Sequence, residues 1–144
     1  YLESNPMDSI PNWGIRWDYG DLDDLVKLLV QDPATRQAWL PVWFPEDTGI
    51  GDGGRKPCTI GYHFLIRDNG LHIHYAIRSC DFIRHMSDDI YLTIRLGLWI
   101  IEKAWQMDMF GPWENITLKT FSMWVGSLHL FENDMISLRQ EYRK

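Results

Sequence analysis

Several features that would assign a protein class at once are scarce in this sequence. Only two cysteines occur, Cys58 and Cys80, so the sequence predicts no disulfide framework and is typical of a reducing cytoplasm. Basic residues are in deficit, 14 Lys and Arg against 20 Asp and Glu, which excludes general nucleic-acid binding because that needs a basic surface. The longest apolar run, residues 90–101, contains Arg95 and is too short to span a bilayer. No internal repeat or signal-peptide pattern is visible.

What the sequence does contain is the apolar patterning of one globular domain. Its 144 residues are 45% hydrophobic and include 8 Trp. This apolar content suffices for one core, and the chain is too short for two domains. The periods of the apolar residues predict an α+β chain over residues 1–144. We expect a helix over residues 21–32 capped by Asp21, a strand over 35–45 interrupted at Pro41, a hairpin over 58–81 turning at Asp68, Asn69 and Gly70, a long buried helix over 88–106, a strand over 115–134 and a polar helix over 135–144.

Two segments raise weaker site hypotheses. The Gly-rich loop over residues 46–56 invites a phosphate-binding interpretation, but no Walker or dinucleotide pattern surrounds it. His72 and His74 alternate along one strand and therefore share a face, which would suit a pair of metal ligands. Because no third ligand stands at a helpful spacing, the sequence favours two half-exposed strand residues and no metal site.

A cysteine and an arginine–serine pair flank the predicted hairpin. Cys58 follows Pro57 where the loop enters the first strand, a place that suits a nucleophile, since a nearby Arg would favour the thiolate. A buried inert thiol is the alternative for a cysteine considered alone. Arg78 and Ser79 end the second strand. A guanidinium beside a hydroxyl suits a phosphate, with a surface ion pair as the alternative.

These residues belong to a set of short motifs that keep a common order. "PC" at 57–58 is followed by "RSCD" at 78–81 and then by the polar Asp89, eleven residues after Arg78. "WGIRW", "DPATRQAWLPVW" and "GSLHLFEND" extend the set over residues 13–135. The order resembles thymidylate synthase and its pyrimidine-hydroxymethylating relatives. The resemblance implies a thymidylate synthase-like fold with a mixed β-sheet, a long buried central helix and a homodimer formed through the sheet face.

The resemblance also implies a role for each matching residue. Cys58 resembles the nucleophile that adds to C6 of the pyrimidine, and Arg78 and Ser79 resemble the residues that bind the phosphate of the nucleotide. Arg36 resembles an arginine that reaches the phosphate bound in the neighbouring subunit, which implies a homodimer. Asp81 resembles the carboxylate that orients the pterin of the folate.

Some positions depart from the family pattern. His129 resembles the histidine near the sugar hydroxyl, but Phe131 replaces its usual tyrosine companion, which leaves the choice between ribose and deoxyribose open. Gln37 replaces the second phosphate arginine, and Thr59 replaces the histidine that follows the catalytic cysteine. These departures predict weaker phosphate and sugar contacts and a divergent member of the family.

Asp89 stands where thymidylate synthases typically carry an Asn that pairs with O4 and N3–H of uracil. Cytosine reverses this edge, with an amino donor at N4 and an acceptor at N3. A neutral carboxylic acid offers one acceptor oxygen and one O–H donor, so it matches cytosine, and desolvation would hold it neutral. Asp at this position resembles the deoxycytidylate hydroxymethylase branch. The alternative is that Asp89 only caps a helix beginning at Ile90.

The sequence thus predicts a one-carbon transferase that hydroxymethylates C5 of a cytidine monophosphate, with 5,10-methylenetetrahydrofolate as cofactor. The first alternative is thymidylate synthase activity, or hydroxymethylation, on dUMP, since the sequence does not show how well the site excludes water. The second is a catalytically inert nucleotide-binding or partner-binding relative, because family segments expected before Tyr1 and after Lys144 have no counterpart here. We therefore expect a fragment or processed form, and the resemblance implies a bacteriophage source acting in the host cytoplasm.

Overall fold

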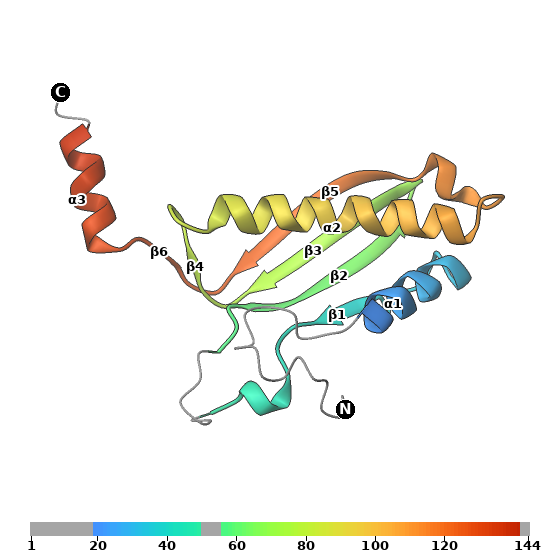
Figure 1. Ribbon diagram of the computed structural model, residues 1–144, viewed down its shortest axis with the longest axis horizontal. Coiled ribbons are helices and arrows are strands. Elements are labelled where there is room, and N and C mark those ends of the chain that lie inside the picture. Colours follow the sequence, from blue (N-terminus) through green and yellow to red (C-terminus); the bar gives the residue numbers. More distant parts are fainter. Residues whose placement is uncertain (1–18, 50–55, 142–144) are drawn as a thin grey trace.

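The chain forms a β-sheet with helices on one side (Figure 1). The computed structural model describes residues 19–49 and 56–141, with the side chains of residues 19–21 excepted. In chain order the elements are α1 Tyr19–Gln31, β1 Trp39–Pro41, η2 Pro45–Asp47, β2 Thr59–Arg67, β3 Gly70–Ile77, β4 Cys80–Asp81, α2 Met86–Met107, η3 Pro112–Asn115, β5 Thr117–Val125, β6 Leu128–His129 and α3 Glu132–Glu141.

Four strands form one mixed sheet in the order β1-β2-β3-β5. β1, β2 and β3 are antiparallel neighbours, whereas β5 runs parallel to β3. A parallel neighbour needs a crossover connection, and α2 lies in the connection between β3 and β5. The short strands β4 and β6 form a separate parallel pair. The mixed sheet that the motifs imply is therefore present.

The hairpin between β2 and β3 is the best-specified local feature. Asp68 and Asn69 have φ angles of 50° and 55°, and Arg67 pairs directly with Gly70. Positive φ at both central residues is the signature of a type I′ turn, whose twist matches that of the flanking strands. The predicted hairpin is confirmed, with Asp68 and Asn69 as the turn and Gly70 as the first residue of β3.

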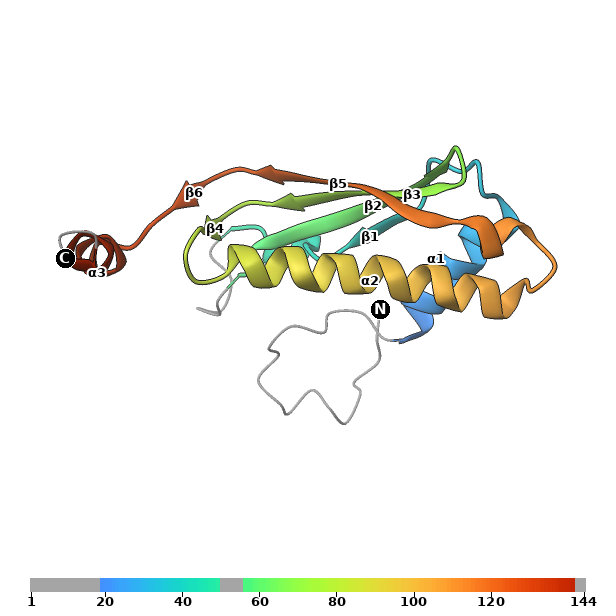
Figure 2. The same ribbon diagram turned by 90° about the horizontal axis from the view of Figure 1, so that it is seen from above.

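The core lies between the sheet and α1 and α2, which cover the same face (Figure 2). Alternate residues of β2 and β3 point into it, among them Phe64 and Ile73, both 0% exposed. The helix α2 approaches β3 closely at Gly97, where an added Cβ would lie 2.5 Å from Cδ1 of Ile73. Glycine at this position therefore allows the helix to pack directly on the strand.

No described element covers the opposite face of the sheet (Figure 2). Strand alternation places Trp39, His63, His74 and Trp124 there, because register partners share a face and Trp39 pairs with His63, which pairs with His74. The residues next to them in the strands, Leu40, Phe64 and Ile73, belong to the core. Trp39 is 43% exposed and Trp124 is 60% exposed. The two tryptophans lie on the two edge strands of the sheet, Trp39 on β1 and Trp124 on β5.

The long helix is present, but it is less buried than predicted. α2 begins at Met86, two residues earlier than expected, and only Thr93, Gly97, Ile100 and Ala104 are buried. The outer face is exposed because the described elements pack on one side of the helix only (Figure 2). Among the described residues, no helix is long and apolar enough to cross a membrane.

Other boundaries also differ from the sequence prediction. Asp21 lies inside α1, which begins at Tyr19, so it is not the residue before the helix. β1 is a three-residue edge strand that ends at Pro41, since proline cannot donate a ladder hydrogen bond. The strand predicted over residues 115–134 is divided into β5 and β6, and α3 begins at Glu132. Residues 50–55 of the Gly-rich loop and the motif at 13–17 lie outside the described residues.

Candidate active site

Cys58 lies immediately before β2, at the end of the sheet where α2 begins (Figure 1). Its side chain is half-buried and packs against a cluster formed by Tyr75, Ile77 and Cys80. We call these four residues the cysteine cluster. A partly exposed thiol at the edge of an apolar cluster is accessible to a ligand and shielded on one side, as a nucleophile requires.

Arg78 binds the chain segment that carries Cys58. Its backbone N–H donates to the carbonyl oxygen of Cys58 at 2.9 Å, and its guanidinium donates to the carbonyl oxygens of Pro57 at 2.8 Å and Lys56 at 3.1 Å. The guanidinium also lies 5.6 Å from the ring centre of Trp43. Because a guanidinium has five N–H donors, donors remain for an anion beside Cys58.

Asp89 lies in the first turn of α2 and meets the same cluster. Its Oδ1 accepts from the hydroxyl of Tyr75 at 3.4 Å, and its Oδ2 lies 3.7 Å from Sγ of Cys80. Burial raises the pKa of this carboxyl, against the opposing effect of the Cys80 and Tyr75 donors. The environment of Asp89 therefore favours the neutral acid more than water would.

The alternative in which Asp89 caps the helix is wrong. The residue before the first turn of α2 is His85, which makes no side-chain capping bond. The backbone N–H of Asp89 donates to the carbonyl oxygen of His85 at 2.9 Å, so Asp89 is already inside the helix. Its carboxyl is consequently not needed to satisfy the first backbone donors.

Tyr75, which the sequence prediction overlooked, joins Asp89 to Thr59, the residue after Cys58. The hydroxyl of Tyr75 lies 2.8 Å from Oγ1 of Thr59, and the ring of Tyr75 stacks on Tyr62 at 4.8 Å and 9°. The sequence pattern could have identified Tyr75, because it stands between Ile73 and Ile77 at a spacing of two residues and so shares their core face of β3. A tyrosine that points inward needs a buried partner for its hydroxyl.

Asp81 lies in β4 and is 4% exposed. Its Oδ1 accepts from the backbone N–H groups of Ile83 and Arg84, both at 3.0 Å. Burial opposes the charged form, but the two backbone donors and the Arg84 guanidinium outweigh it, so the pKa of this carboxyl lies below its usual value. Oδ2 is buried without a hydrogen-bond partner among the described residues, although Nε of Arg84 lies 3.7 Å away.

His129 lies beside Asp81 in the pairing of β4 with β6. Its carbonyl oxygen accepts from the N–H of Phe82 at 3.0 Å, and its ring meets Phe131 edge-on at 5.4 Å. The strand pairing therefore brings Asp81 and His129, which are far apart in the sequence, to one place next to the cysteine cluster.

Arg36 lies just before β1, which is an edge strand of the sheet. Its side chain is exposed, and its carbonyl oxygen is 3.0 Å from Nε2 of His63. Ser79 is half-buried next to Arg78. The roles of both residues stay predictions.

The paired histidines of β3 contact hydroxyl groups of β5. His72 lies 2.7 Å from Oγ1 of Thr120 and His74 lies 2.5 Å from Oγ of Ser122. Within the described parts of the chain, no group of three His, Cys, Asp or Glu side chains could hold a metal ion.

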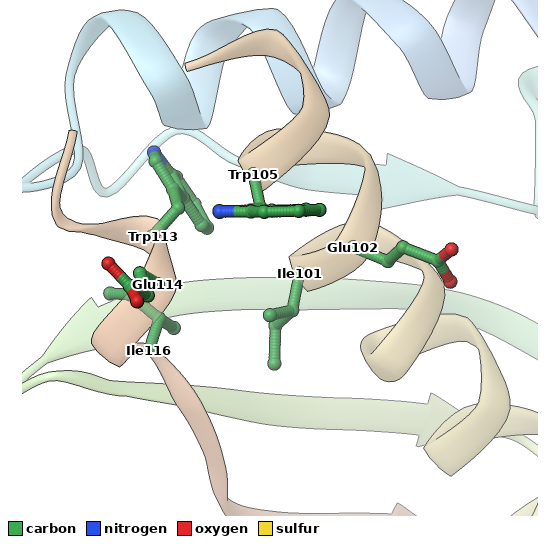
Figure 3. Close-up of a pocket in the computed structure, with 6 residues that line it drawn as sticks. All are labelled: Ile101, Glu102, Trp105, Trp113, Glu114 and Ile116. Carbon is green, nitrogen blue, oxygen red and sulfur yellow. The ribbon is translucent and has the colours of Figure 1, made fainter. Parts of the chain in front are cut away.

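Two surface cavities lie elsewhere and contain neither Cys58 nor Asp89. Figure 3 shows one, of about 240 Å³, between the C-terminal half of α2 and η3. The other, of about 330 Å³, lies between α1 and the β1 region. The first is lined by Ile101, Glu102, Trp105, Trp113, Glu114 and Ile116, and the second by Asp24, Leu25, Leu28, Gln37, Trp39, Leu40, Pro41 and Phe44.

Comparison with known proteins gives a likeness of fold. No protein-family model matches this sequence, and no curated protein matches it. Among solved structures, thermostable thymidylate synthase A from Bacillus subtilis is similar, with a TM-score of 0.66 at 17% sequence identity. The likeness covers 86% of this chain and 40% of the synthase chain, so this chain spans about two fifths of the length of that protein. At this identity the comparison shows the fold alone, which is thymidylate synthase-like.

Proposed function

We propose that this protein transfers a one-carbon unit to C5 of a pyrimidine nucleoside monophosphate, and that it hydroxymethylates the cytosine of dCMP. The observation that carries the proposal is the position of Asp89, whose half-buried carboxyl adjoins the cysteine cluster and has a pKa raised by burial. The thymidylate synthase-like fold supports the reaction class. The choice of cytosine rests on the acid itself, which can donate to N3 and accept from N4.

In this proposal Cys58 is the nucleophile. Its sulfur forms a bond to C6, and the electron pair of the C5–C6 double bond moves into the ring as N3 takes the proton of Asp89. C5 then has the electron density needed to attack the one-carbon unit. The C5 proton would be lost, and breakage of the carbon–nitrogen bond to the folate would leave a methylene group on C5. Water would add to this methylene and give the hydroxymethyl group, the Cys58 thiolate would leave C6 and restore the ring, and Asp89 would regain its proton from N3.

The phosphate of the nucleotide is assigned to Arg78 and Ser79, with Arg36 supplied by a second subunit. The guanidinium of Arg78 lies against the backbone just before Cys58, so an anion held there would place the attached base near the thiol. His129 is assigned to the sugar hydroxyl. Phe131 packs against its ring and offers no donor, so His129 would make this contact without a neighbouring hydroxyl.

The described residues fit a folate cofactor at one point. Oδ2 of Asp81 is buried and has no hydrogen-bond partner among them, and a buried acceptor of this kind is costly unless a donor reaches it. An N–H group of a bound pterin would supply that donor. When bound, 5,10-methylenetetrahydrofolate would supply the one-carbon unit. The role of Asp81 would be to orient the cofactor.

A homodimer through the uncovered sheet face belongs to the same proposal. Trp39 and Trp124 are exposed on that face, and pairing of two such faces would bury both. A twofold interface repeats each contact, so each Arg36 would stand in the same relation to the partner's site.

The decisive test compares dCMP with dUMP. Binding of both nucleotides is measured by calorimetry for the wild type and for Asp89→Asn, with Asp88→Asn, an exposed neighbour on the same turn, as the control. An unpaired buried donor or acceptor costs about 1–3 kcal/mol, so two mismatched groups should give about 10²–10⁴-fold preference for dCMP. Asp89→Asn should move the preference toward dUMP, and Asp88→Asn should not. A wild type that prefers dUMP would make thymidylate synthase activity the better assignment.

A further inference from the structure

A buried hydroxyl lies next to Asp89. Tyr75 is 1% exposed, and its hydroxyl donates to Oδ1 of Asp89 at 3.4 Å. The same hydroxyl lies 2.8 Å from Oγ1 of Thr59. A series of three hydrogen-bonded side chains, Thr59, Tyr75 and Asp89, therefore links the residue after Cys58 to the carboxyl in α2.

The surroundings hold this hydroxyl in place. The ring of Tyr75 stacks on that of Tyr62 at 4.8 Å with planes 9° apart, and Ile77 and Cys80 complete the packing. Because the hydroxyl is buried, it cannot exchange its protein partners for water without leaving a polar group unsatisfied. Burial therefore confines this hydroxyl to its protein partners, and its proton points at either Oγ1 of Thr59 or Oδ1 of Asp89.

That direction determines where the proton of Asp89 resides. Since Thr59 can donate to Tyr75, the single hydroxyl proton of Tyr75 can point at Oδ1 of Asp89. In a neutral carboxylic acid the carbonyl oxygen is the better acceptor. Oδ2 faces the Cys80 thiol at 3.7 Å, and a thiol is a weaker donor than a hydroxyl. The stronger donor at Oδ1 thus leaves the acid proton on Oδ2.

We propose that Tyr75 is a positioning residue, which sets the oxygen of Asp89 that carries the acid proton and thereby the pyrimidine edge that the site accepts. The inference rests on the proposed function and deepens it. With the proton confined to one oxygen, the carboxyl presents its donor and acceptor in a single order, which matches N3 and N4 of cytosine. Without Tyr75 the order can reverse, and the same carboxyl can pair with N3–H and O4 of uracil.

The first measurement needs no nucleotide. The carboxyl carbon of Asp89, labelled with ¹³C, is titrated by NMR in the wild type and in Tyr75→Phe. Loss of a donor to Oδ1 should raise the pKa of Asp89, because that donor stabilises the carboxylate. Tyr91→Phe is the control, since it removes the hydroxyl of a tyrosine that lies two residues from Asp89 in α2 and is 63% exposed. A fall of the pKa in Tyr75→Phe would show that Asp89 donates to Tyr75 and would overturn the inference, as would no change.

The second measurement is the ratio of the dissociation constants for dUMP and dCMP. Tyr75→Phe should lower this ratio about three- to tenfold, the effect of one ordinary hydrogen bond. General damage to the pocket would weaken both nucleotides alike, so a lower affinity with an unchanged ratio also overturns the inference. If Tyr75→Phe does not fold, Thr59→Val, which removes the donor to Tyr75, should move the ratio in the same direction.

The two measurements separate the inference from the function on which it rests. If the wild type shows no preference for dCMP, the proposed function fails regardless of the NMR result. If the wild type prefers dCMP and Tyr75→Phe retains the full preference, the proposed function stands and the positioning role of Tyr75 is removed.

Discussion

The thiol of Cys80 lies 3.7 Å from Oδ2 of Asp89, next to a second cysteine with a different environment. Cys80 is 2% exposed. Its burial, and to a smaller extent the nearby Asp89 carboxyl, raise the pKa of its thiol to about 11. Cys58 is only half-buried. The two thiols of this chain should consequently differ in reactivity, because the thiolate is the reactive form.

Alkylation tests this difference directly. Iodoacetamide at neutral pH should modify Cys58 and leave Cys80 unmodified in the folded protein, as read by peptide mass spectrometry. Both thiols should react after unfolding in urea, which controls for detection of each peptide. Equal rates at the two cysteines in the folded state would contradict the burial of Cys80.

Replacement of the nucleophile should separate binding from turnover. Cys58→Ser should abolish the release of tritium from C5 of labelled dCMP in the presence of methylenetetrahydrofolate, since the thiol forms the bond to C6. Nucleotide affinity should change by less than about threefold, because the phosphate contacts do not involve the thiol. Tritium release by purified Cys58→Ser would remove Cys58 from the mechanism.

Local patterns in the sequence predicted the parts of the fold that local physics determines. The turn at Asp68 and Asn69 follows from residues that tolerate positive φ, and the length of α2 follows from its apolar spacing. The link between Tyr75 and Asp89 could not be obtained this way. It depends on how α2 crosses β3, and a close approach at Gly97 is a tertiary event without a local signature.

The same limit explains the errors at the ends of elements. An acidic residue before an apolar run favours a cap, yet α2 continues past Asp89 toward the N-terminus as far as Met86. The separate pair of β4 with β6 was not predicted, because it joins Asp81 to His129. These two residues are separated along the chain by the whole of α2 and β5. The motifs named the other candidate site residues, whereas Tyr75 and the contacts among all of them required the fold.

Arg36 provides a test of the proposed dimer. Mixing Arg36→Ala chains with Cys58→Ser chains should restore activity at about a quarter of the wild-type sites, because half of randomly formed dimers are hybrids and one of their two sites has both groups. Mixing Cys58→Ser with the Arg36→Ala, Cys58→Ser double variant is the control and should remain inactive. A protein that is monomeric at all accessible concentrations in ultracentrifugation would rule out this role of Arg36.

The raised pKa of Asp89 predicts how its contribution to stability depends on pH. Since burial raises the folded-state pKa above the ordinary value of 3.8, the folded protein binds this proton more tightly than the unfolded chain. The resulting stabilisation is complete below the unfolded-state pKa and is lost as pH rises through the folded-state pKa. Asn cannot ionise, so the free energy of unfolding of Asp89→Asn relative to wild type should increase as pH rises through that interval and then level off.

Urea unfolding of both proteins at a series of pH values from acid to neutral measures this difference. Asp88→Asn removes the same formal charge from an exposed side chain one residue away, and it corrects for the change in net charge. A relative stability of Asp89→Asn that falls as pH rises would mean that the folded protein stabilises the Asp89 carboxylate. The carboxyl would then be an anion in the folded protein, and the donor that the proposed cytosine pairing requires would be missing.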